Sequence, residues 1–138
     1  MAFVFPVHIL VHIVWSTWDR LPLIPADRDA ELGAYLGAKA RELRCVLLAC
    51  GSADDHVHVV ASLHSTVAVA TLAQRLKGAS AHDLSRRGWP HALRWQAGYW
   101  ARSVGESHLD DLLPYVSRQR SHHDTSSPAE AWMRVRTE

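Results

Sequence analysis

This chain has little cysteine and no excess of either sign of charge. Each of these two features excludes a class of protein. Cys45 and Cys50 are its two cysteines, too few for a disulfide framework and typical of buried thiols in a cytosolic protein. Lysine and arginine total 15 against 14 acidic residues, a formal charge of +1. This balance excludes a polycation that coats nucleic acid by charge alone, although it is compatible with a local basic face.

Long apolar runs are missing as well. No stretch approaches the roughly 18 apolar residues of a membrane span, and residues 1–6 lack the basic start of a secretion signal. We therefore expect a cytoplasmic protein without a membrane partner. With 48% hydrophobic and 21% charged residues the chain can build an ordinary core, and no repeat divides it. We predict a single domain over residues 1–138, with a short tail from about residue 124.

The hydrophobic pattern predicts alternating strands and helices. Strands are expected at 7–17, 45–50, 56–63 and 94–104, and helices at 28–43, 67–87, 107–123 and 129–135. The first six elements have the order β-α-β-β-α-β, which is that of the ferredoxin-like, RRM-like α+β fold. This fold is an antiparallel sheet of four strands with two helices on one face. The helix that follows Gly105 is then expected to cover the other face.

Histidine and tryptophan are abundant, with ten and six copies, and two histidines alternate within one predicted strand. Residues i and i+2 of a strand point to the same face, so His56 and His58 share a face while the neighbouring valines face the helices. The pair then lies on the open face, within reach of one metal ion. Taken alone, two strand histidines that alternate by chance are the more common explanation. His8 and His12 also share a face and are assigned to the core or sheet surface.

A second pattern lies in the helix predicted at 107–123. Tyr115 and Gln119 are four residues apart and therefore share a helix face. Taken alone, a half-buried tyrosine beside a surface glutamine explains them. Combined with the histidines they indicate chemistry, because a tyrosine that attacks a phosphodiester needs a metal to polarise the phosphoryl oxygens. Two imidazoles and one amide oxygen can hold such an ion and leave positions open for phosphate.

Six short motifs follow one another along the chain: HIVWST at 12–17, DHVHV at 55–59, LKG at 76–78, WQAGY at 95–99, SVG at 103–105 and YVSRQ at 115–119. As an ordered set they resemble the motifs of the IS200/IS605-like single-tyrosine transposases of the HUH family, which include the REP-associated tyrosine transposases. The resemblance runs from His8 to about Glu130.

The resemblance implies the HUH nuclease fold, with cleavage and joining of single-stranded or hairpin DNA through a 5′-phosphotyrosine. It implies Mg²⁺ or Mn²⁺ as cofactor and a homodimer, and the apolar first strand and the aromatic fourth strand suggest where protomers pair. Matched residue by residue, it makes Tyr115 the nucleophile, His56 and His58 the metal pair, Gln119 the third metal ligand and Gly105 a hinge.

Several side chains are candidates for DNA contact. Basic residues near the ends of predicted elements can track phosphates, and a tryptophan in a polar loop can stack on an unpaired base. They are Arg20, Arg75, Lys77, Arg118 and Trp18. His122 and His123, one helical turn beyond Gln119, could approach a phosphate or the metal, although a solvated helix end explains them better.

The leading hypothesis is a metal-dependent DNA endonuclease and strand transferase. The alternative is a domesticated, RRM-like nucleic-acid-binding regulator that has lost cleavage. The intact His56–His58 and Tyr115–Gln119 pairs favour the enzyme, because a pure binding protein has no chemical need for them. A replication initiator of the HUH type is disfavoured by the short chain.

Overall fold

The computed structural model describes residues 7–121 and 128–137. His122 and His123 lie outside the described residues. The tail predicted from about residue 124 includes a helix, α4 (Pro128–Thr137), close to the helix expected at 129–135.

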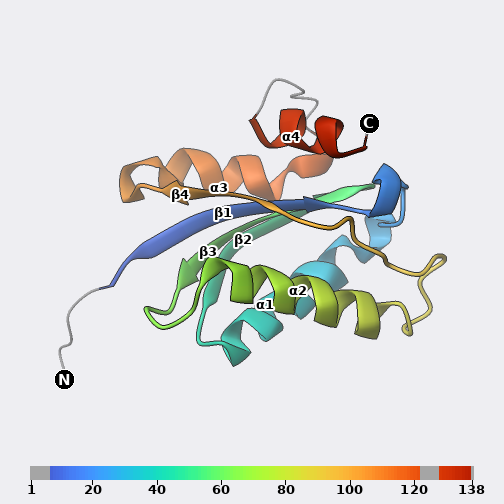
Figure 1. Ribbon diagram of the computed structural model, residues 1–138, viewed down its shortest axis with the longest axis horizontal. Coiled ribbons are helices and arrows are strands. Elements are labelled where there is room, and N and C mark those ends of the chain that lie inside the picture. Colours follow the sequence, from blue (N-terminus) through green and yellow to red (C-terminus); the bar gives the residue numbers. More distant parts are fainter. Residues whose placement is uncertain (1–6, 122–127, 138) are drawn as a thin grey trace.

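The centre of the molecule is the predicted antiparallel sheet of four strands (Figure 1). Its strands are β1 (Ile9–Ser16), β2 (Val46–Ala53), β3 (His56–Leu63) and β4 (Trp100–Val104), in the order β2-β3-β1-β4. β1 is paired with β3 on one side and β4 on the other, which accounts for its almost completely buried apolar sequence. Because β1 is interior, the pairing between protomers expected through the first strand is wrong, and β2 and β4 form the edges.

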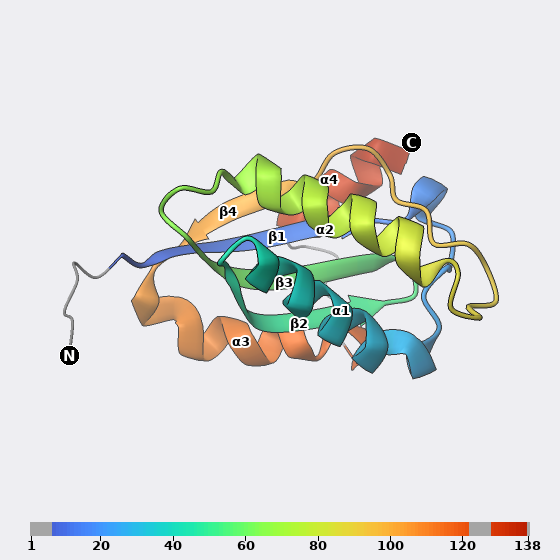
Figure 2. The same cartoon turned by 90° about the horizontal axis from the view of Figure 1, so that it is seen from below.

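Two helices cover one face of the sheet, as predicted. They are α1 (Asp29–Glu42) and α2 (Val69–Leu84), which lie in front of the sheet in Figure 2. Leu36 of α1 and Leu76 of α2 are fully buried against Trp15 and the β3 valines, Val57 and Val59. The alternation of β3 therefore directs Val57 and Val59 into the main core and its histidines to the opposite face.

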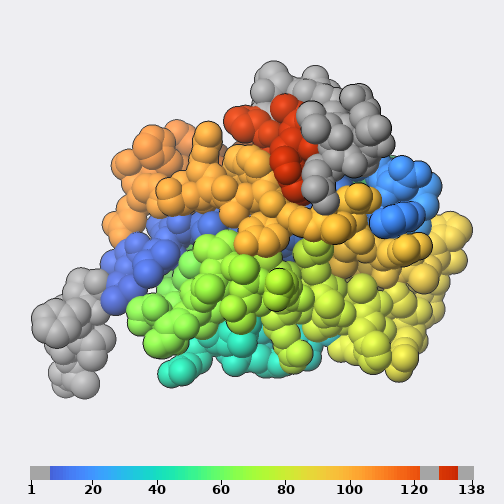
Figure 3. Space-filling model, viewed as in Figure 1, coloured from blue at the N-terminus to red at the C-terminus, as the bar shows by residue number. Residues whose placement is uncertain are grey.

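The opposite face is covered by α3 (Leu109–Ser117) and α4 (Figure 1). α3 packs over β2 and β3, whereas α4 packs over β1. Ala129 and Met133 of α4 form a small apolar cluster with Val14 of β1 and the side of Trp100. In the space-filling view α4 (red) lies against the segment that carries β4 (orange), as Figure 3 shows.

Several element boundaries differ from the predicted ones, among them those of β4, β2 and α3. β4 begins at Trp100 because the residues before it form a loop, with a positive φ at Gly98 and a single bridge between Trp95 and Thr17. β2 runs on to Ala53, three residues beyond its predicted end. The helix predicted at 107–123 ends at Ser117 and is followed by a separate 3₁₀ turn. Within the described ranges, no helix is long and apolar enough to cross a membrane.

Candidate active site

The sheet face between α3 and α4 gathers histidines from two strands. His56 and His58 of β3 point to this face. The β1–β3 register places His58 opposite Val14, so His12, two residues earlier on β1, is a diagonal neighbour of His58 on the same face. Three imidazoles therefore lie in a row, with ring centroids 5.2 Å apart for His56 and His58 and 5.1 Å apart for His58 and His12.

A carboxylate holds the ring of His56 from one side. Nδ1 of His56 lies 2.8 Å from Oδ1 of Asp55, and Nε of Arg20 donates to Oδ2 of Asp55 at 3.0 Å. Burial raises the pKa of Asp55, but the hydrogen bonds from His56 and Arg20 outweigh burial and hold that pKa below its usual value. Asp55 is therefore an ionised group that fixes the orientation of His56.

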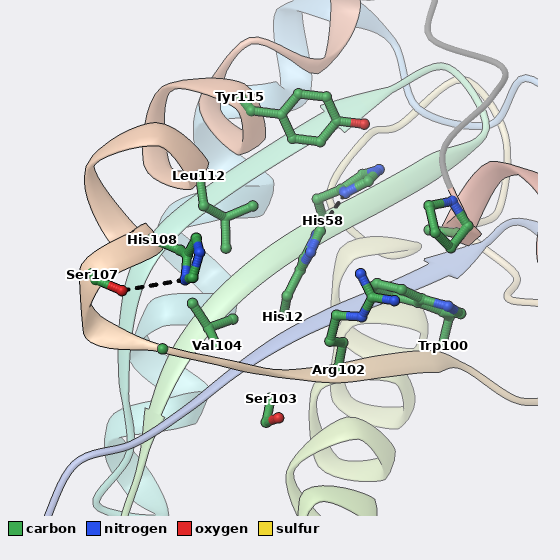
Figure 4. A pocket seen from close by; sticks show the side chains of 13 residues that line it. His12, His58, Trp100, Arg102, Ser103, Val104, Ser107, His108, Leu112 and Tyr115 are labelled. Atoms are coloured by element: carbon green, nitrogen blue, oxygen red, sulfur yellow. Dashed lines mark hydrogen bonds between the residues drawn. The ribbon is translucent and has the colours of Figure 1, made fainter.

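The ring of His58 is fully buried and contacts the third imidazole. Nδ1 of His58 and Nε2 of His12 are 2.9 Å apart, a hydrogen-bond distance (Figure 4). The edge of Trp100 packs against His12, with ring centroids 5.2 Å apart. Burial, and to a lesser extent the positive charge of Arg102, lowers the pKa of His12 to about 4. His12 is therefore neutral at physiological pH.

Tyr115 projects from α3 toward this row of histidines. Its ring meets that of His58 edge to face, with centroids 5.9 Å apart and planes at 83°. Both side chains line a cavity of about 870 Å³ between α3 and α4, with Trp100 and Arg102 in its wall (Figure 4). The structure thus brings the expected nucleophile and one of the expected metal ligands to the same cavity.

Gln119 reaches the same site from beyond the end of α3. It begins the 3₁₀ turn Gln119–Ser121 and is 5% exposed. Its Nε2 donates to the carbonyl of Tyr115 at 3.0 Å, and its Oε1 lies 3.3 Å from Nε2 of His56. The expectation that Tyr115 and Gln119 share one continuous helix is wrong, yet the folded-back amide still faces the histidine pair.

Two contacts fix the end of α3 to the sheet. Gly51 of β2 has no side chain where the backbone carbonyl of Val116 passes, and a Cβ atom at position 51 would overlap this carbonyl. Beyond the helix, the guanidinium of Arg120 donates to both carboxylate oxygens of Asp29, at 2.6 and 2.9 Å, and to Asp54. Contacts within one chain therefore hold Tyr115 against its own sheet.

The structure adds a carboxylate that the sequence analysis did not identify. Oε1 of Glu130, in α4, lies 3.4 Å from Nε2 of His56. Potential ligand atoms of His56, His58 and Glu130 lie within 4.8 Å of one another, and the amide oxygen of Gln119 is close by. Two imidazole nitrogens with a carboxylate and an amide oxygen fit a divalent cation, and the two oxygens are ligand types that Mg²⁺ and Mn²⁺ favour.

Three of the side chains expected to contact DNA lie near the site, Trp18 and Arg20 in the 3₁₀ turn after β1 and Arg118 at the end of α3. Trp18 is 41% exposed, and the guanidinium of Arg94 lies over its ring, 4.1 Å from the centroid. Arg20 is engaged by Asp55. Arg118 is the exposed residue at the C-terminal end of α3.

The other two lie on α2, across the sheet from Tyr115. Nζ of Lys77 donates to the carbonyls of Gln96 and Gly98, at 2.8 and 2.7 Å, and so fastens the loop before β4. Arg75 forms an exposed ion pair with a glutamate of α1. The structure does not bring these two to the cavity. Gly105 has a φ of −77°, which any residue can adopt. The DNA contacts and the hinge stay predictions.

Comparisons with known proteins identify the family and the fold. The sequence model of a family described as "Transposase IS200 like" matches residues 7–119. Among solved structures, a Deinococcus radiodurans R1 protein described as a transposase has a TM-score of 0.63 and 20% identity, covering 88% of this chain and 98% of that one. A REP-associated tyrosine transposase bound to a REP hairpin has a TM-score of 0.57 and 13% identity, covering 84% of this chain and 70% of that one.

These two structures share the fold with this chain. No curated protein matches the sequence. The family match spans most of the chain, including both histidines of the β3 pair, Tyr115 and Gln119. The chain belongs to the family of IS200-like transposases.

Proposed function

We propose that this chain is a metal-dependent endonuclease and strand transferase that acts on single-stranded, hairpin-bearing DNA through a 5′-phosphotyrosine at Tyr115. One observation carries the proposal: the ring of Tyr115 meets His58 in an open cavity, while oxygens of Gln119 and Glu130 approach His56. The hairpin substrate is supported by the related fold of the REP-associated transposase, which is bound to a REP hairpin.

The proposed metal ligands are His56, His58 and Gln119, with Glu130 as a fourth. Mg²⁺ or Mn²⁺ held by these groups would neutralise charge on the oxygens of the scissile phosphate. Asp55 keeps the ring of His56 oriented through Nδ1. Gln119 is anchored through its amide nitrogen to the carbonyl of Tyr115, so the amide oxygen and the nucleophile are positioned by the same segment.

The proposed reaction conserves the energy of the phosphodiester bond. The hydroxyl oxygen of Tyr115 attacks phosphorus, loses its proton and forms a new P–O bond, while the bond to the 3′ oxygen breaks. The departing 3′ oxygen takes up a proton and becomes a free hydroxyl. In the second half, the 3′-hydroxyl of another strand attacks the phosphotyrosine and releases Tyr115 in its original form.

The direct test compares two tyrosine variants on a hairpin oligonucleotide with a single-stranded flank, in the presence of Mn²⁺. Tyr115→Phe should bind the hairpin as the unaltered protein does but form no covalent adduct on a denaturing gel. Tyr99→Phe is the matched control, because Tyr99 packs against the main core on the other side of the sheet, and it should form the adduct normally. Undiminished cleavage by Tyr115→Phe would overturn the mechanism.

The same gel separates the enzyme from the alternative of a binding regulator. If the unaltered protein binds the hairpin but forms no adduct with Mg²⁺ or Mn²⁺, the regulator explains the data and the proposed enzyme does not.

A further inference from the structure

The two histidines of the proposed metal pair are held in the same way but by different partners. Each has its Nδ1 atom within hydrogen-bond distance of another side chain. For His56 that partner is the carboxylate of Asp55, at 2.8 Å, and for His58 it is the imidazole of His12, at 2.9 Å. Both Nδ1 atoms being engaged, Nε2 is the nitrogen through which either ring can bind a cation.

The partner at Nδ1 decides whether Nε2 can bind. A neutral imidazole carries one proton, and the nitrogen without it is the one that binds a metal. Asp55 can only accept, so its contact with His56 places a proton on Nδ1 and leaves Nε2, which faces Gln119 and Glu130, as the nitrogen for a cation. His12 can accept or donate, and the two arrangements have opposite consequences. If His12 donated to Nδ1 of His58, the proton of His58 would lie on Nε2 and block binding.

We propose, as an extension of the proposed function, that His12 is a positioning residue whose Nε2 accepts a hydrogen bond from Nδ1–H of His58. This bond holds His58 in the tautomer whose Nε2 is ready to bind the divalent cation. His12 thereby does for His58 what Asp55 does for His56, without adding a further carboxylate to the site.

The surroundings of His12 support the acceptor role. Its ring is 7% exposed and packs against His58 on one side and the edge of Trp100 on another, so its orientation is restrained. The nitrogen that faces Nδ1 of His58, at 2.9 Å, is Nε2 of His12, and an imidazole accepts a hydrogen bond through an unprotonated ring nitrogen.

The first test reads the tautomer directly in the protein without metal or DNA. Long-range ¹H–¹⁵N correlation NMR at neutral pH distinguishes protonated from unprotonated imidazole nitrogens. The proposal predicts a proton on Nδ1 of His58 and none on its Nε2. A proton on Nε2 of His58 would overturn it. Because this measurement involves no cleavage, it stands apart from the adduct test of Tyr115, and either can fail alone.

The second test is a rescue series measured by Mn²⁺ binding, read by electron paramagnetic resonance. His12→Leu removes the acceptor, and loss of such a partner weakens metal affinity by about 10–100-fold. His12→Gln places an amide oxygen near the position of Nε2 and should restore most of the affinity. His8→Gln is the control, because His8 is exposed and pairs with Glu106 away from the site, and it should match the unaltered protein.

A His12→Leu variant that folds and binds Mn²⁺ as tightly as the unaltered protein would also overturn the proposal. If His12→Leu fails to fold, the tautomer measurement on the unaltered protein and the affinity of His12→Gln still decide it. Affinity equally weak in His12→Gln and a folded His12→Leu would count against the acceptor role.

Discussion

Replacing Gly51 by alanine should misplace the tyrosine helix without unfolding the protein. A Cβ atom at position 51 would lie 2.8 Å from the carbonyl carbon of Val116, nearer still to its oxygen, and 3.2 Å from Cγ of Gln119. Ordinary contacts between such atoms begin near ~3.5 Å. The obstacle is backbone and cannot rotate away, so the end of α3 must retreat from the sheet by on the order of 2 Å before the oxygen of Val116 reaches an ordinary contact.

A displacement of only about 1 Å at a reacting group can already cost about 100-fold in rate. We therefore expect Gly51→Ala to form the covalent adduct about 100-fold more slowly in single-turnover assays, with hairpin binding retained. Gly37→Ala is the matched control, because a Cβ atom there meets no heavy atom within 4 Å. It lies in a helix, where alanine is favoured over glycine by about 1 kcal/mol, and should react normally. If Gly51→Ala formed the adduct as fast as this control, the claim that the close contact between β2 and α3 positions Tyr115 would be refuted.

Three further expectations follow from the same contacts. Glu130→Gln should weaken Mn²⁺ binding, because it removes the carboxylate beside His56. The control Glu42→Gln, at an exposed ion pair on α1, should leave Mn²⁺ affinity unchanged. Equal Mn²⁺ affinities of the two variants would show that Glu130 is not a ligand. Burial, aided by the charge of Asp29, raises the pKa of Cys50 to about 12. Its thiol therefore stays protonated at pH 8 and should resist alkylation by iodoacetamide in the native protein. Rapid alkylation of Cys50 would contradict this expectation. The exposed edge of β4 needs a partner, and light scattering should show a homodimer at micromolar concentration; a monomer would contradict the dimer implied by the family.

The topology could be predicted from local patterns because each element has a distinct period. The alternation in β3 gave its bounds and the face of each residue, and the element order then implied a ferredoxin-like sheet. The strand predicted at 45–50 ends before Gly51, whereas β2 continues through it. Gly51 allows the backbone of α3 to approach the strand closely, and that approach depends on tertiary structure.

The candidate site was predictable where its residues share one element or a known motif. His56 and His58 alternate on β3, and Tyr115 and Gln119 are close in sequence. His12 was not identified, because its contact with His58 depends on the register between β1 and β3, which sequence spacing does not reveal. Glu130 was missed for a similar reason.

Glu130 belongs to a helix whose position depends on apolar packing against Val14 of β1. The residues that make this packing, Ala129 and Met133, lie before and after Glu130 in the sequence. Their spacing gives no sign that Glu130 lies beside His56. Glu130 can therefore be identified as a potential metal ligand only from the three-dimensional structure, in which α4 packs over the sheet.

The central claim is that Tyr115 is the residue that becomes linked to DNA, and peptide mapping by mass spectrometry tests it most directly. The chain has three tyrosines. Tyr35 is held by a hydrogen bond to the carbonyl of Ala79 on the helix side of the sheet, and Tyr99 packs against the main core. After reaction with a hairpin oligonucleotide and digestion, we predict a nucleotide mass on the peptide that contains Tyr115. A nucleotide on the peptide of Tyr35 or Tyr99 would contradict the account.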